Sequence, residues 1–227
     1  MKKQFQSSFF KFIGIILVLL LACKKEKDDP NKVSDIDGNV YKTVKIGANT
    51  WMAENLKTTR YNNGDLIGTT TSENADVTQE DEPKYQWAYN DDESNVPVYG
   101  RLYTYYAATD YRNICPKGWH LPTYYEWRIM VDYVGGEDVA GGNLKEKGTD
   151  HWKSPNTGAT DDYGFRALPG GIRFPMGIYN WQHTSANFWC YKDENYVNLW
   201  RLYYDYSEIS KLNYMESTGF CVRCVQN

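Results

Sequence analysis

Two cysteines near the C-terminus, Cys221 and Cys224, lie three positions apart in the segment GFCVRCVQN. This C-x-x-C spacing occurs in thiol–disulfide enzymes, in metal-binding sites and in structural bridges. A reactive pair normally lies at a helix N-terminus, where the helix dipole favours the thiolate, whereas β-forming residues flank this pair. If the segment is a strand, its alternating side chains place the two sulfur atoms on opposite faces. We therefore expect no redox chemistry here and a separate partner for each cysteine.

Other residue patterns that support catalysis or metal binding are scarce. His120, His151 and His183 lie far apart in the sequence and in no His/Cys ligand spacing, so no zinc site is predicted. No G-x-S-x-G, P-loop or H-E-x-x-H motif is present. Acidic residues are plentiful, but the sequence alone gives none of them a perturbed environment that would mark it as catalytic. We therefore expect a protein that is not an enzyme.

Aromatic residues crowd the C-terminal third and provide the candidates for ligand binding. Exposed Trp and Tyr rings form stacking surfaces for sugars and anchors for protein partners. If the segment LWRLYYDY is a strand, Tyr203 faces away from the face shared by Trp200, Leu202, Tyr204 and Tyr206, which is expected to be core. Tyr179, Trp181 and Tyr203 are the candidate ligand-binding residues, and core packing is the alternative explanation for these rings.

The elements that must position these residues indicate an α+β fold. A helix is predicted from Thr123, which forms a capping box with Glu126, to a stop at Gly135 or Gly136. The apolar residues between them recur at helical spacing. The chain then becomes glycine-rich and is expected to be irregular, and after residue 179 its aromatic and β-branched segments predict strands. Helices followed by strands, with much loop, are typical of α+β domains.

The N-terminus predicts export. Residues 1–11 are basic without acidic residues, and residues 12–22 form an apolar run that is short for a membrane span of about 20 residues. The run ends in LLAC, which resembles the bacterial lipobox. We therefore predict that residues 1–22 are a lipoprotein signal peptide and that Cys23 becomes lipidated. A plain signal peptide with an incidental cysteine is the alternative.

A charged tether is expected to join the lipid anchor to the domain. Residues 23–32 nearly lack apolar side chains after the cysteine and cannot bury surface, whereas residues 33–227 have the composition of a single globular domain. The tether also resembles the surface-export signals of some Bacteroidetes lipoproteins. An outer-membrane lipoprotein is therefore predicted, and both the periplasmic face and the cell surface stay open.

The charge distribution bears on the expected partners. The formal net charge is −4 and no basic patch stands out, so nothing supports a nucleic-acid partner. The expected partners are the membrane, through the lipid anchor, and a glycan or a surface protein.

Several motifs in a fixed order carry a family resemblance. The strings DGNVYKTVKIG, ICPKGWHLPTYYEW, GFRALPGGIR and GFCVRCV closely resemble the Fibrobacter succinogenes major paralogous domain family, over residues 37–225. Members are typically exported bacterial proteins, often lipoproteins, without an established biochemical activity. The string GWHLPTYYEW also looks like a signature of formylglycine-generating-enzyme-type domains. The resemblance implies a C-type-lectin-like fold, with about two helices packed on small twisted antiparallel sheets and long irregular loops.

The resemblance also bears on the cysteines. With Cys23 set aside, four cysteines remain, and these allow three connectivities. Cys115 and Cys224 match cysteines of the family, whereas Cys190 and Cys221 stand at serine-like positions. The resemblance therefore implies the disulfide bonds Cys115–Cys224 and Cys190–Cys221. That pairing would leave no thiol nucleophile in the domain.

Calcium is the one cofactor that the implied fold suggests, because lectin-like domains often hold this ion with loop oxygens. The sugar-binding calcium motifs of lectins are missing, so solvated loop acids are the alternative reading of the candidate ligands Asp91, Asp92, Asp161 and Asp162. We expect a non-catalytic binding role at the cell envelope or surface. A formylglycine-generating-enzyme-like or other envelope enzyme, and a purely structural envelope protein, are the two alternatives.

Overall fold

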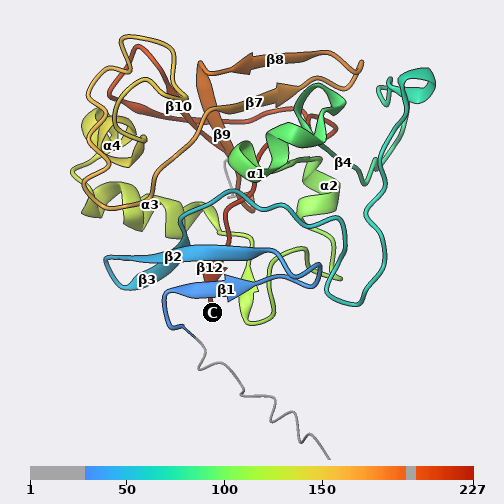
Figure 1. Ribbon diagram of the computed structural model, residues 1–227, viewed down its shortest axis with the longest axis horizontal. Coiled ribbons are helices and arrows are strands. Elements are labelled where there is room, and N and C mark those ends of the chain that lie inside the picture. The colour runs from blue at the N-terminus through green and yellow to red at the C-terminus, as the bar shows by residue number, and fades with distance from the viewer. Residues whose placement is uncertain (1–28, 193–197) are drawn as a thin grey trace, which may run out of the picture.

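The structure is a computed structural model that describes residues 29–192 and 198–227. The predicted signal peptide, Cys23 and most of the tether lie outside the described residues. Inside them, no helix is both long enough and apolar enough to cross a bilayer. The domain combines short helices with several antiparallel sheets, which confirms the predicted α+β class (Figure 1).

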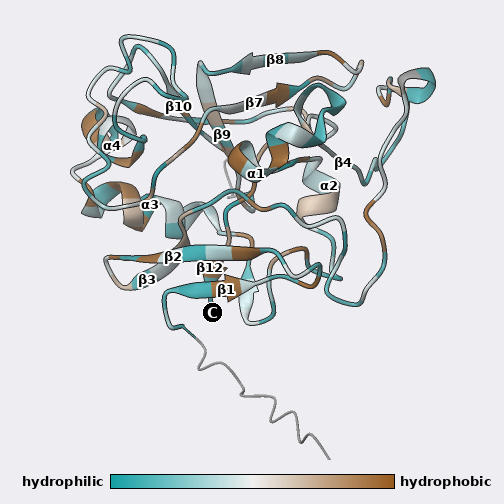
Figure 2. Cartoon of the chain, in the orientation of Figure 1, coloured by the Kyte–Doolittle hydropathy of each residue, from teal (hydrophilic) through white to brown (hydrophobic). Residues whose placement is uncertain are grey.

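Most elements are short. The strands are β1 (Lys32–Ser34), β2 (Val40–Ile46), β3 (Asn49–Met52), β4 (Gln86–Trp87), β5 (Leu102–Tyr103), β6 (Trp119–His120), β7 (Gly170–Arg173), β8 (Tyr179–Gln182), β9 (Ser185–Trp189), β10 (Leu199–Tyr203), β11 (Ile209–Leu212) and β12 (Val225–Gln226). The helices are α1 (Val96–Tyr99), α2 (Tyr105–Ala108), α3 (Tyr124–Tyr133) and α4 (Glu137–Leu144), with 3-10 turns η1 (Ser72–Asn74), η2 (Tyr89–Asp91) and η3 (Glu93–Asn95). The loop that carries η1 is mainly hydrophilic (Figure 2).

The largest sheet joins the two ends of the described chain. Its strand order is β1-β2-β3-β12-β6, so the last strand lies between β3 and β6. Val225 pairs with Trp51 on one side and with His120 on the other. The last strand therefore lies inside the sheet whose edge strand is β1, near which the described chain begins (Figure 1).

A second sheet, with the order β11-β10-β9, lies on the other side of α3 (Figure 1). Trp127 of α3 packs between the sheets, with its ring centroid 5.2 Å from that of Trp51 and 6.0 Å from that of Trp200. All three indole rings are fully buried. Large aromatic side chains at this junction bury the most apolar area per residue and therefore hold the two sheets together.

Helix α3 confirms the predicted capping box. The Thr123 hydroxyl accepts a hydrogen bond from the Glu126 backbone N–H, and the Glu126 carboxylate accepts one from the Thr123 backbone N–H at 2.8 Å. Gly135 and Gly136 follow the helix with φ of +113° and +91°, a region that favours glycine. The chain therefore leaves α3 where the sequence predicts.

Helix α4 was not predicted, because its glycines suggested irregular chain. Gly141 and Gly142 face other backbone segments so closely that a Cβ atom on Gly141 would collide with the carbonyl oxygen of Glu208. The Gly142 N–H donates to the Ser207 carbonyl at 2.8 Å. These glycines therefore serve close backbone packing against the 207–208 turn instead of breaking the helix.

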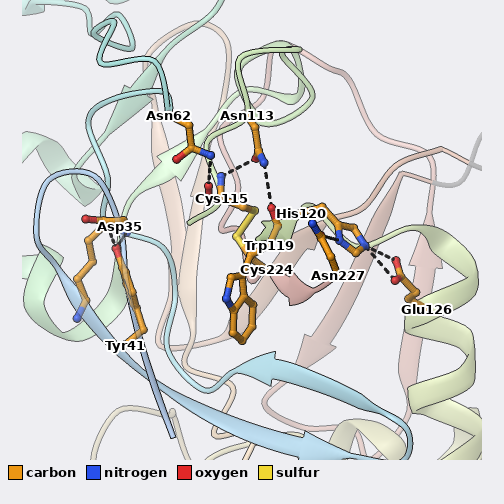
Figure 3. The surroundings of a disulfide bond; sticks show 11 residues. Asp35, Tyr41, Asn62, Asn113, Cys115, Trp119, His120, Glu126, Cys224 and Asn227 are labelled. Atoms are coloured by element: carbon orange, nitrogen blue, oxygen red, sulfur yellow. Dashed lines mark hydrogen bonds and ion pairs between the residues drawn. A yellow bond between two sulfur atoms is a disulfide. The ribbon is translucent and has the colours of Figure 1, made fainter. Parts of the chain in front are cut away.

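The disulfide Cys115–Cys224 is formed, as the family resemblance implied, with the two Cα atoms 5.8 Å apart (Figure 3). It closes a loop of 109 residues and ties the last strand to the segment before β6. Asn62 and Asn113 hydrogen-bond to the backbone of Cys115 at 2.7 and 2.8 Å. The bridge is thus part of a buried, hydrogen-bonded structural site.

The second predicted bridge is wrong, because the structure does not join Cys190 to Cys221. Cys221 pairs in parallel with Phe188 of β9, and Phe188 comes two residues before Cys190 in the sequence. Two residues along a strand and one step across the sheet separate Cα atoms by about 8 Å, which exceeds the reach of a disulfide. The Cys221 sulfur instead accepts a hydrogen bond from Asn55 Nδ2 at 3.4 Å. Cys221 and Cys224 do face different core clusters, as strand alternation predicted.

Candidate functional site

A pocket of about 330 Å³ opens beside β10 and β11. It is lined by Arg201, Tyr203, Tyr206, Glu208 and Ser210 and is called the Arg201 pocket below. The antiparallel register places Arg201 opposite Ser210, so both side chains project from the same face of the sheet. The pocket combines aromatic rings, a cation, a carboxylate and a hydroxyl group within one small concave site.

Strand alternation explains which residues reach this pocket. Trp200 and Leu202 are fully buried toward α3, whereas Arg201 and Tyr203 are half-buried on the opposite face. Tyr206 was expected on the core face, but β10 ends at Tyr203 and the alternation stops there. The Tyr206 side chain is therefore 55% exposed, and its ring centroid lies 6.2 Å from that of Tyr203.

Arg201 is the cation of the site, and the groups that contact its side chain are neutral. Its Nε donates to Asn187 Oδ1 at 2.7 Å, and its Cζ lies 4.9 Å from the Trp181 ring centroid. Nη2 is buried without a hydrogen-bond partner, and no carboxylate of the described residues forms an ion pair with this side chain. Burial lowers the pKa of the guanidinium, yet its ordinary value is so high that the group stays charged. The site therefore contains a positive charge that forms no ion pair with a carboxylate of the described residues.

Lys145 fixes the turn that carries the two tyrosines. Its Nζ donates three hydrogen bonds, to the carbonyl oxygens of Thr157, Tyr203 and Tyr206 at 2.9, 2.9 and 2.8 Å. The side chain is fully buried, and burial lowers the pKa of Lys145 to about 8. An ammonium group has three N–H donors, so all of them are satisfied. Lys145 therefore acts as a positioning residue for Tyr203 and Tyr206.

The predicted ligand-binding residues do not all meet in one place. Tyr203 lines the Arg201 pocket and Trp181 packs on Arg201. Tyr179 does not line the pocket; its hydroxyl donates to Asp91 Oδ1 at 2.5 Å. Arg201 and Tyr206 were missed by sequence reasoning, because the first needs the β10–β11 register and the second needs the end of β10.

Three of the four calcium candidates accept hydrogen bonds from the protein in the described residues. Asp92 caps η3 by accepting the Ser94 N–H at 2.9 Å, and Asp161 accepts the Arg166 N–H at 2.7 Å. Asp91 accepts from Tyr179, and Asp162 is exposed. Within residues 29–192 and 198–227, no three or more His, Cys, Asp or Glu side chains are grouped so that they could hold a metal ion.

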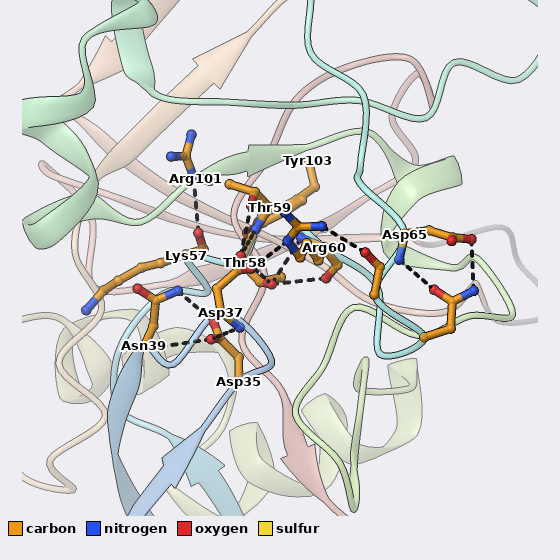
Figure 4. A network of polar contacts seen from close by, with 12 residues as sticks. Asp35, Asp37, Asn39, Lys57, Thr58, Thr59, Arg60, Asp65, Arg101 and Tyr103 are labelled. Atoms are coloured by element: carbon orange, nitrogen blue, oxygen red, sulfur yellow. Dashed lines mark hydrogen bonds and ion pairs between the residues drawn. The ribbon is translucent and has the colours of Figure 1, made fainter.

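A second polar pocket, of about 380 Å³, lies beside α1 and is lined by Asp37, Lys57, Glu93 and Arg101 among others. Its charges are paired within the protein. Glu93 pairs with Arg101, and Lys57 pairs with Glu54 at 2.9 Å. Asp37 accepts hydrogen bonds from Thr58 and Thr59 (Figure 4). These polar groups already bond to other parts of the protein. This pocket therefore has fewer unpaired polar groups for a ligand than the Arg201 pocket has.

Cys221, which lies outside the disulfide bridge, is poorly suited to nucleophilic chemistry. Cys221 is 1% exposed, and burial raises the pKa of its thiol to about 12. The nearby Arg223 guanidinium favours the thiolate but does not outweigh the burial. Near neutral pH the group is therefore a thiol, whereas a reactive cysteine needs the thiolate.

The chain belongs to the Fibrobacter succinogenes major domain family, whose model matches residues 44–226. No curated protein and no solved structure matches it. Two arginines of the family-like motifs GGIR and VRC, Arg173 and Arg223, are buried and donate to backbone oxygens. These motif residues are therefore structural, and the Arg201 pocket lies outside them.

Proposed function

We propose that this chain is a non-catalytic carbohydrate-binding lipoprotein of the cell envelope, with a C-type-lectin-like fold and its sugar site in the Arg201 pocket. The observation that carries the proposal is the combination of Tyr203 and Tyr206 with the hydrogen-bonding groups of Arg201, Glu208 and Ser210 in one concavity. Aromatic faces stack on the apolar faces of sugar rings, and charged and hydroxyl groups satisfy the sugar hydroxyls.

The size of the pocket favours a small ligand over a protein surface. Small-molecule sites occupy about 300–1,000 Å³, a range that includes this pocket of about 330 Å³. A stable protein interface buries about 800 Å² on each partner, which a pocket lined by five residues does not supply by itself. A glycan is therefore the better of the two expected ligands.

The protonated state of Cys221 supports a binding role over the enzyme alternative, because a thiol-dependent oxidase needs a reactive thiolate. The purely structural alternative predicts that no ligand enters the Arg201 pocket.

The lipid anchor on Cys23 is proposed from the sequence. Labelling with radioactive palmitate should modify the wild-type chain and not the Cys23→Ser variant, and equal labelling would exclude this anchor.

A glycan microarray tests the sugar-binding proposal. The chain carrying Cys23→Ser is used, so that no lipid anchor is present, and this form is called the unlipidated chain. It should bind a defined subset of glycans, and Tyr203→Ala should weaken that binding by about tenfold or more. Tyr125→Ala is the matched control, because Tyr125 is 58% exposed on α3 and lies outside the pocket. Binding to no glycan, or equal loss in both variants, would contradict the proposal.

A further inference from the structure

A third pocket, of about 360 Å³, is lined mainly by apolar side chains. Phe174, Pro175, Met176, Tyr214 and Met215 form most of its wall, and it is called the methionine pocket below. Met176 and Met215 are 50% and 62% exposed, so their side chains are accessible to a ligand that enters this pocket. Methionine side chains are flexible and polarisable, and they are common where a protein binds apolar groups of variable shape.

The methionine pocket adjoins the Arg201 pocket through Arg201 itself. Arg201 lines the first pocket, and its Cζ lies 5.5 Å from the ring centroid of Tyr214, which lines the second. Trp181 contacts both sides as well. Its ring is 4.9 Å from Arg201 Cζ and 5.7 Å from the ring of Phe174. The guanidinium and the indole ring therefore lie between the two pockets, and both side chains are only partly buried.

The backbone at Trp181 is held in a conformation that its side chain disfavours. Trp181 has φ of +62°, a region in which bulky residues are rare. The Thr184 hydroxyl and N–H both donate to the Trp181 carbonyl, at 3.0 and 3.1 Å, and fix this turn. Such conformations persist where surrounding contacts enforce them and cluster at ligand-binding sites. Here the enforced turn places the indole ring between the two pockets.

We propose that the Arg201 pocket and the methionine pocket are two subsites for one amphiphilic ligand, a glycoside with an apolar aglycone. This inference rests on the proposed sugar site. The sugar lies in the Arg201 pocket, and the aglycone passes over the side chains of Arg201 and Trp181 and enters the methionine pocket. The first subsite offers charged and hydroxyl groups, whereas the second offers mainly carbon and sulfur surface, so the two ends of the ligand must differ in polarity.

Paired alkyl glycosides test the inference. Methyl and octyl β-glycosides of glucose, galactose, mannose and N-acetylglucosamine are titrated into the unlipidated full chain, with the octyl compounds kept below their micelle concentration. Each fully buried methylene strengthens binding about fourfold. For at least one sugar, the octyl glycoside should therefore bind at least about tenfold more tightly than the methyl glycoside.

Surface variants separate the two subsites. The double variant Met176→Ser/Met215→Ser should remove the gain from the octyl chain and leave methyl glycoside binding unchanged. Ile129→Ser is the matched control, because Ile129 is 56% exposed on α3 and lines neither pocket. Both methionines are exposed, so these changes are expected to leave the fold intact.

The outcomes distinguish the inference from the sugar site on which it rests. Methyl glycoside binding with no gain from the octyl chain, or a gain that survives the double methionine variant, overturns the two-subsite inference alone. If octyl glycosides bind equally well whatever their sugar, and if Tyr203→Ala leaves this binding unchanged, the apolar site is separate from the sugar site. That result also overturns the two-subsite inference. Absence of binding by every methyl and octyl glycoside overturns both proposals.

Discussion

At the residue scale, the molecule holds several buried cations with neutral partners. Lys145 donates to three carbonyl oxygens, and Arg223 donates to Asn55 Oδ1 at 2.8 Å and to two carbonyl oxygens. Burial lowers the pKa of Arg223 to about 9. Each cation satisfies the orphaned carbonyl groups of loops that form few regular backbone pairs. Single buried side chains therefore order irregular segments of the chain, and Lys145 does so beside the Arg201 pocket.

Lys145→Met should lower the free energy of unfolding by about 3 kcal/mol or more, because three buried carbonyl oxygens lose their donor. Urea denaturation of the purified chain measures this change. Lys147→Met is the control, since Lys147 is exposed and no ion pair or hydrogen bond of its side chain is seen in the described residues. A difference below about 0.5 kcal/mol between Lys145→Met and wild type would show that the three bonds do not hold the turn.

Asp110 gives a pH-dependent contribution to stability. Its side chain is fully buried and pairs with Arg112 at 2.8 Å and Lys84 at 2.9 Å. Hydrogen bonds from Arg112 hold the pKa of Asp110 well below its ordinary value. A folded-state pKa below the unfolded one means that the ionised carboxylate stabilises the fold above about pH 4, and that this contribution is lost as the pH falls further.

The stability gap between wild type and Asp110→Asn should therefore be about 3 kcal/mol and constant from pH 5 to pH 8. It should shrink progressively below pH 4. Denaturation curves at pH 7, 4 and 3 measure the gap. A gap that stays constant down to pH 3, or that widens there, would contradict the depressed pKa of Asp110.

At the element scale, the structure shows which local patterns predict an element and which do not. Helix α3 was predicted because its capping box and apolar spacing both lie within one segment. Helix α4 was missed because Gly141 and Gly142 are explained only by Ser207, Glu208 and Gly158, which lie far along the chain. Cys221 lies opposite Phe188 and not opposite Cys190. This register joins segments that are distant in the sequence, so no local pattern predicts it.

The cysteine assignment gives an element-scale prediction. With Cys23 replaced by serine, thiol titration in denaturant without reductant should detect the Cys221 thiol, because the disulfide of the described residues joins Cys115 to Cys224 and leaves Cys221 outside it. Finding none would restore the Cys190–Cys221 bridge.

Reduction of the chain should lower the free energy of unfolding by about 4 kcal/mol, since the Cys115–Cys224 bridge closes a loop of 109 residues.

The matched control for that measurement is the Cys115→Ala/Cys224→Ala variant. Reductant should leave its stability unchanged, because the bridge is already absent. If reductant still destabilises this variant by several kcal/mol, a second disulfide exists.

At the scale of the whole molecule, composition and motif order predict the α+β class and the family, and the matched region, residues 44–226, covers most of the chain. The candidate site was predicted only in part. Tyr203 and Trp181 were identified as aromatic candidates, but the Arg201 pocket is assembled from β10, β11 and a turn fixed by Lys145 from another part of the chain. Such convergence depends on tertiary packing, which no local pattern in the sequence reports.

The most direct test of the sugar site is nuclear magnetic resonance mapping on the isotope-labelled, unlipidated chain with a glycan that it binds. We predict that the largest shifts occur at Arg201 Nε–H, at the rings of Tyr203 and Tyr206 and at Ser210, and that Tyr203→Ala removes them. Shifts centred on the pocket beside α1, at Lys57 and Arg101, or no shifts at saturating glycan, would contradict a carbohydrate site in the Arg201 pocket.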